Sequence, residues 1–209
     1  MPVWQEMRQE LKDKNFEVIT LDCDVKIEAA REWILAAQPQ HPSLLDPRQV
    51  VSSLYNAKNV PTEVWINEDG EIVRYDEGVY VRRRNQETGE FTINERYLRA
   101  VRDWVENGAN SRFALESAEA RKRLKPLTAE DAQAATYFRL GVHLYQQGYG
   151  EDAVPYFKKA RELKPENWNL TRQAFNLGNP EQDYGTTIQK EREVRPMYVP
   201  LDMPSFTEA

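Results

Sequence analysis

The sequence has little of the chemistry on which most enzyme sites depend. Its 209 residues contain one cysteine, Cys23, and two histidines, His41 and His143. A single thiol excludes an internal disulfide and any Cys-x-x-Cys pair within these residues. Two histidines so far apart make a poor metal site, and we find no Ser-His-Asp set or phosphate loop. We therefore expect no metal and no other cofactor.

Two further absences exclude classes of partner. The net charge of -6 argues against a nucleic-acid protein, because phosphate binding is driven by an excess of Lys and Arg. No apolar run approaches the ~20 residues that span a bilayer, so we expect no membrane span. Residues 1–6 do not resemble a signal peptide. The protein is expected to be cytoplasmic if Met1 is the natural start, whereas an extracytoplasmic location stays open if an N-terminal segment precedes it.

The clearest local pattern is a strand, an acidic turn and a second strand. Residues 64–66 and 72–73 are strong strand formers, and Asp69-Gly70 between them supplies a turn in which glycine takes a positive φ. The pattern predicts an antiparallel hairpin. Pro61 stands just ahead of the first strand, where it breaks no ladder bond.

Helical and strand patterns alternate around this hairpin. Residues 3–14 and 27–37 show helical spacing of apolar residues, and a strand pattern at residues 16–21 lies between them. Residues 43–46 are predicted to form a short apolar strand, and a helix is predicted to begin at Pro47. A last helix carries Tyr97, Leu98, Val101 and Trp104. The alternation predicts an α/β domain.

Three of these segments, in this order, resemble the TlpA/ResA-like branch of the thioredoxin superfamily. They are Asn15–Leu21, His41–Pro47 and Asn59–Thr62, and the resemblance covers residues 1–107. In that family the proline of the third segment is cis, and its loop faces a redox dithiol and receives the substrate chain. The resemblance therefore implies that Val60, Pro61 and Thr62 bind substrate.

The departure from that family concerns the dithiol itself. There, a central strand and a Trp-Cys-x-x-Cys turn come immediately before the helix that begins here at Met1-Pro2. We keep three explanations open: the dithiol lies upstream of Met1, the sheet closes differently or through a partner chain, or this relative has abandoned redox chemistry. Without the central strand, residues 16–21 and 63–67 would expose unpaired edges. This predicts association through strand pairing, and so a homo-oligomer, or poor order of residues 1–24.

The one thiol is a weak catalytic candidate. Cys23 lies between Asp22 and Asp24, whose negative charges oppose formation of a thiolate. We expect a buried structural thiol, with a single-thiol active site as the alternative.

A second hairpin is predicted within residues 75–94, from alternation in Val79-Tyr80-Val81 and in Phe91-Thr92-Ile93. The run Arg82-Arg83-Arg84 could hold a phosphate or carboxylate. Acidic neighbours such as Glu87 and Glu90 favour a simple solvated face instead.

The second half of the chain resembles a single tetratricopeptide (TPR) repeat. A linking helix is expected within residues 108–127, and Thr128 with the acidic residues after it suits a helix start. The repeat with its capping helix would span residues 128–178, and a proline-containing extended tail would span 179–209. The residues at the signature positions are Tyr137, Leu140, Gly141, Gly148, Ala153, Phe157, Ala160 and Pro165.

The sequence therefore predicts a thioredoxin-like α/β domain, incomplete at its N-terminus, followed by an all-α TPR-type domain. One hypothesis is a relative of thiol-disulfide oxidoreductases whose dithiol lies upstream of Met1. The other is a redox-inactive scaffold on the same folds. Both hypotheses imply a protein or peptide partner, bound by the cis-proline loop and by the groove of the repeat.

Overall fold

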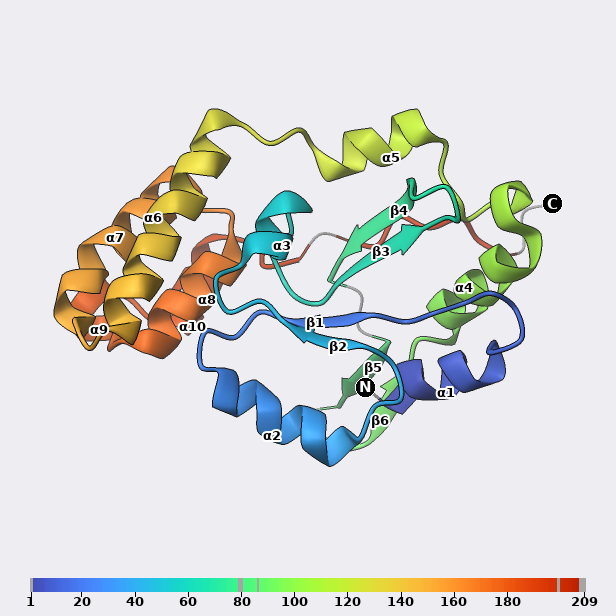
Figure 1. The fold of residues 1–209 in the computed structure, drawn as a ribbon, viewed down its shortest axis with the longest axis horizontal. Coiled ribbons are helices and arrows are strands. Elements are labelled where there is room, and N and C mark those ends of the chain that lie inside the picture. Colours follow the sequence, from blue (N-terminus) through green and yellow to red (C-terminus); the bar gives the residue numbers. More distant parts are fainter. Residues whose placement is uncertain (1, 79–80, 86, 199, 207–209) are drawn as a thin grey trace.

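The computed structural model describes residues 2–78, 81–85, 87–198 and 200–206, and it is a mixed α/β molecule (Figure 1). Strands lie at the centre, α1 and α4 at one end, and the helices from α6 onward at the other. The mixed strands and helices of the first half and the helices of the second agree with the coarse prediction. Among the described residues, no helix is both long and apolar enough to cross a membrane.

The first half alternates short strands with helices. The helices are α1 (Pro2–Glu10), α2 (Ile27–Ala37), α3 (Val50–Leu54) and α4 (Glu95–Asn107), and the strands are β1 (Thr20–Asp22), β2 (Ser43–Leu45), β3 (Thr62–Ile66), β4 (Ile72–Glu77), β5 (Arg82–Arg84) and β6 (Phe91–Ile93).

Two expected elements differ in position. The helix predicted over residues 3–14 ends at Glu10, and the chain turns before Asn15, which takes a φ of 53°. The strand predicted over residues 16–21 is found at 20–22, because its pairing begins where the Thr20 amide donates to the Pro42 carbonyl, 3.0 Å away. A strand pattern alone did not show where its partner begins.

The described strands form three separate two-stranded sheets. β1 and β2 are parallel, with Leu21 opposite Leu44, whereas β3 and β4 form the predicted antiparallel hairpin. β5 and β6 form the second predicted hairpin. Within the described ranges, no strand pairs with the free edge of β1 or of β3. Association through strand pairing, or poor order of residues 1–24, stays a prediction; within residues 2–24, Met7 is buried.

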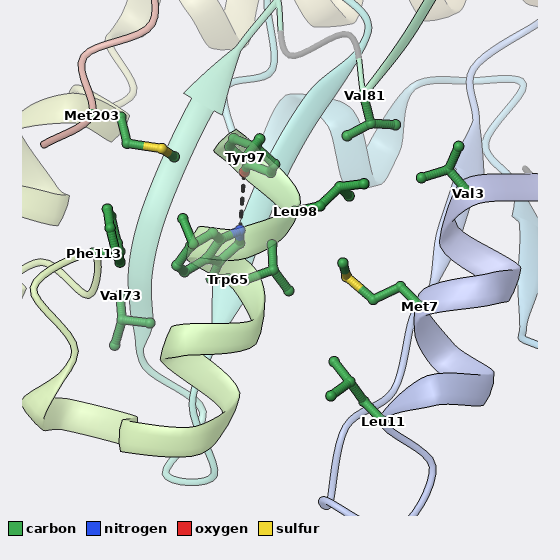
Figure 2. Packing of buried hydrophobic residues seen from close by; sticks show 12 residues of the cluster. Val3, Met7, Leu11, Trp65, Val73, Val81, Tyr97, Leu98, Phe113 and Met203 are labelled. Carbon is green, nitrogen blue, oxygen red and sulfur yellow. Dashed lines mark hydrogen bonds between the residues drawn. The ribbon is translucent and has the colours of Figure 1, made fainter. Parts of the chain in front are cut away.

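The core of the first half forms around Trp65. Its indole Nε1 donates to the Tyr97 hydroxyl at 3.0 Å, and its ring stacks on Trp104 with centroids 5.0 Å apart. Figure 2 shows Met7 of α1, and Leu11 just after this helix, pointing toward the residues of α4 and β3. Both helices thus cover the Trp65 face of the hairpin.

The second half is helical. After the short 3-10 turn Gly108–Asn110 come α5 (Ser117–Leu124), α6 (Ala129–Gln146), α7 (Gly150–Leu163), α8 (Trp168–Leu177), α9 (Pro180–Tyr184) and α10 (Ile188–Val194). The predicted tail is thus not extended throughout, because α9 and α10 lie within residues 179–209. Asn179 and Thr187 cap these two helices with their side chains, a local signal for a helix start that the proline content obscured.

Close packing joins α6 to α7. Thr128 and Asp131 form a capping box at the start of α6, and Gly148 turns the chain between the helices with a φ of 88°. A Cβ at Gly141 would lie only 2.7 Å from the Phe157 ring, so a side chain larger than hydrogen would force the pair apart.

Gly141→Ala should therefore lower the free energy of unfolding by about 1–3 kcal/mol, the usual cost of overpacking a core. Urea denaturation followed by circular dichroism measures it. Gly150→Ala is the matched control, because its Cβ would meet no atom closer than 4.0 Å, and it should leave stability unchanged or slightly raised. Equal stability of the two variants would contradict the packing described.

Candidate functional site at the junction of the two halves

Helix α8 joins the helical half to two segments of the first half. The Asn169 amide donates to the Lys58 carbonyl at 3.0 Å, and the Asn169 side chain donates to the Ala57 carbonyl at 2.8 Å. One turn further, Gln173 donates to Asp24 at 2.7 Å and accepts from the Val25 amide at 3.0 Å. Asn169 and Gln173 are buried and their partners are buried or half-buried, so these bonds fix the register of one half against the other.

The loop that precedes β3 lies at this junction. The Val60–Pro61 peptide bond is cis, as predicted. Thr62 donates its hydroxyl to the Asn59 carbonyl at 2.6 Å, and the Gly78 amide donates to the Pro61 carbonyl at 2.8 Å. The structure therefore holds Val60, Pro61 and Thr62 together in one tight loop against the end of β4.

Other parts of the chain occupy the polar groups of Val60. Its carbonyl accepts from the Tyr198 hydroxyl at 3.1 Å, and Arg172 lies 3.5 Å from the same oxygen. The Val60 amide donates to the Asn59 side chain at 2.9 Å. The tyrosine also covers Gly78, where a Cβ would come within 2.6 Å of the ring. The backbone that the family resemblance implies would pair with a substrate is thus covered by the chain itself.

Cys23 follows β1 in a setting that favours the protonated thiol. Its sulfur lies 3.0 Å from the Ser52 hydroxyl, which in turn lies 2.9 Å from the Asp46 carboxylate. Burial, together with the negative charges of Asp46, Asp22 and Asp24, raises the pKa of Cys23 to about 11, although the hydrogen bond with Ser52 works against this. The thiolate is scarce at neutral pH.

Glu63 is the residue that the sequence reasoning missed. It is half-buried on the same strand face as Trp65 and stands directly opposite Asp76 in the ladder. Burial, and then the negative charge of Asp76, raise the pKa of Glu63 to about 8. The signal was present, because alternation along the strand places residue 63 on the inward face with residue 65.

The second hairpin has a less informative arginine run. The guanidinium of Arg82 lies 3.6 Å from the centroid of the Phe91 ring, a cation–π contact. The side chains of Arg83 and Arg84 lie outside the described part of the structure, as do Val79 and Tyr80. The described contacts therefore add nothing in favour of an anion-binding run over the solvated face that we expected.

The repeat positions lie mainly in the helix packing. Gly141, Ala153, Phe157 and Ala160 are buried between α6, α7 and α8. The other positions lie nearer the surface: the Tyr137 ring stacks with Tyr156, Leu140 is 40% exposed, Gly148 forms the interhelical turn and Pro165 follows α7. These residues pack the helices or turn the chain between them, and their assignment as signature positions of a TPR repeat stays a prediction.

Two cavities lie beside the β3–β4 hairpin. One of ≈ 430 Å³ is bordered by Leu54, Ile66 and Leu127, and one of ≈ 280 Å³ is bordered by Lys58, Tyr75 and Arg123. Among the residues that the structure describes, no three His, Cys, Asp or Glu side chains are grouped so that they could hold a metal ion.

Comparison with known proteins gives no relative: no family model, no curated protein and no solved structure matches this chain. Its function therefore has to be argued from the junction itself.

Replacing Glu63 by Gln tests the electrostatics of this junction. The pKa of Glu63 is raised in the folded chain from its ordinary 4.5 to about 8, so ionising it costs folding energy. Wild-type stability should fall as pH rises from 4.5 toward 8, whereas Glu63→Gln removes this dependence. Above pH 8 the variant should be more stable by about 3–5 kcal/mol, and below pH 4 the two should be similar.

Glu71→Gln, at an exposed position in the same hairpin, is the control and should follow the wild type at every pH. Urea denaturation at a series of pH values gives the comparison. If the difference between Glu63→Gln and wild type is constant across this range, Glu63 is not the group that titrates.

Proposed function

We propose that this chain is a redox-inactive binding protein, in which a thioredoxin-like domain and a TPR-type helical module together hold an extended segment of a protein partner. The observation that carries the proposal is the state of Cys23. It is the one thiol of the 209 residues, it is paired with Ser52, and its pKa is raised to about 11.

Thiol–disulfide exchange requires two things that this chain lacks. The attacking group is a thiolate, and a second thiol must resolve the mixed disulfide. Cys23 is held as a thiol, and the sequence has no second cysteine. A dithiol brought from outside these residues would also have to approach Val60-Pro61, where Tyr198 and Arg172 already lie.

The junction supports binding rather than chemistry. The cis-proline loop and α8 form one polar surface, from which Asn59 and Trp168 donate to the carbonyls of Met197 and Pro196 in the C-terminal residues. Surfaces of this kind bind peptides through main-chain hydrogen bonds, with side-chain contacts adding selectivity.

The chain should not reduce insulin above the rate of dithiothreitol alone, because Cys23 has no resolving partner. Turbidity of precipitating insulin measures this, with Cys23→Ser as the matched control. Both proteins should match the background. Turnover by the wild type that Cys23→Ser abolishes would establish a single-thiol active site and overturn the proposal.

The alkylation rate of Cys23 tests the same conclusion without a substrate. At pH 8 the folded chain should react with iodoacetamide about 100-fold more slowly than the chain unfolded in urea, since the pKa rises from 9.0 to about 11 on folding. Mass spectrometry follows the reaction. Equal rates in the folded and unfolded chains would show that the thiol is exposed and reactive.

A further inference from the structure

The last part of the chain crosses the first half as an extended segment. This C-terminal segment is residues 196–206, of which residue 199 lies outside the described ranges. It leaves α10 and runs past the β3–β4 hairpin toward the end of the molecule that carries α4 (Figure 1). In its described part no residue belongs to a helix or strand.

Side chains of other elements bind the backbone carbonyls at the start of this segment. The Trp168 indole donates to the Pro196 carbonyl at 3.2 Å, and the Asn59 side chain donates to the Met197 carbonyl. Asn59 is itself buried and is oriented by Arg172, which donates to its side-chain oxygen at 3.2 Å.

Three arginines bind the carbonyls further along. Arg74 and Arg123 both donate to the Asp202 carbonyl, at 2.7 and 3.1 Å, and Arg96 donates to the carbonyls of Met203 and Pro204. Arg74 is fully buried and is also bonded to Asp76 and to the Phe113 carbonyl. Two contacts outside the segment, to Asp76 and to residue 113, therefore also fix the position of Arg74.

We propose that these donors form a groove for an extended, proline-containing segment of a protein partner, and that residues 196–206 are its in-chain occupant. We name it the carbonyl groove, lined by Asn59, Arg74, Arg96, Arg123 and Trp168. The inference rests on the proposed function, to which it adds the class of ligand.

The composition of the segment matches a groove made of donors. Pro196, Pro200 and Pro204 have no N–H and present only a carbonyl acceptor, and prolines favour an extended backbone at low entropic cost. Hydrogen bonds to backbone carbonyls do not depend on which side chains the segment carries, so another segment of the same backbone conformation can accept them.

Three side chains of the segment supply the selectivity. Tyr198 donates to Val60 at 3.1 Å, the Asp202 carboxylate accepts from Arg123 at 2.8 Å, and Met203 is 6% exposed in the core of the first half. A partner segment that takes this place should therefore carry a hydroxyl-bearing aromatic, then an acidic residue four positions later, then a large apolar residue.

The probe is a synthetic peptide of residues 194–206 with fluorescein at its N-terminus, added to the full chain. Tyr198→Phe removes one hydrogen bond from the in-chain occupant and leaves the groove intact. Because the two copies compete, the peptide should bind this variant about fivefold more tightly than the wild type. Tyr149→Phe, at an exposed turn between α6 and α7, should bind like the wild type.

Fluorescence anisotropy gives the affinities, and hydrogen exchange locates the effect. Bound peptide should speed exchange of the amides within residues 197–206 and leave α6 and α7 unchanged. A scrambled peptide should not bind. Absence of binding to all three proteins, or equal affinity for Tyr198→Phe and Tyr149→Phe, would overturn the proposal.

Light scattering on Tyr198→Phe separates a further outcome. If this variant forms a dimer that the free peptide dissociates, the carbonyl groove binds residues 196–206 of a second copy. This outcome would overturn the proposal of a partner protein. The peptide assay is independent of the insulin assay. Turnover of insulin would contradict the redox-inactive function but not the carbonyl groove. Failure of the peptide to bind would contradict only the carbonyl groove.

Discussion

The relation between the two halves depends on the amide side chains of α8. Asn169 and Gln173 lie one turn apart on one face of α8. Each forms two hydrogen bonds with the first half, Asn169 with backbone carbonyls and Gln173 with a carboxylate and a backbone amide. Such buried polar contacts add modest net stability, but leaving one partner without the other is costly. These bonds therefore fix how the two halves dock, because a shifted docking would leave several polar groups without hydrogen-bond partners at once.

A second constraint operates inside the first half, where Arg74 is buried on the Trp65 face of the hairpin. Its charge lies 5.4 Å from the Trp65 ring and is paired with Asp76, and its other donors meet the carbonyls of Phe113 and Asp202. A buried cation is tolerated only when it is paired and its donors are satisfied. The core of the first half is therefore complete only when residues 113 and 202 are in place.

Local pattern predicted local structure well. Alternation and an Asp-Gly turn predicted the β3–β4 hairpin, and small residues at helical spacing predicted the α6–α7 pair. Two features could not be read in this way. The position of β1 depends on where β2 begins, and the docking of the C-terminal segment depends on donors such as Arg74 that lie far away in sequence. No periodicity encodes such a pairing, so the segment looked like an ordinary proline-containing tail.

The contact between Tyr198 and Val60 also bears on how the chain folds. The two residues are 138 positions apart, and the contact between Arg74 and Asp202 spans 128. The entropic cost of closing such long loops comes before the stabilising contacts form, so contacts of this kind slow folding. During synthesis the first half emerges long before the residues that complete it. The hairpin must therefore wait, with Arg74 paired to Asp76 but lacking two of its carbonyl acceptors, until residues 113 and 202 have been synthesised.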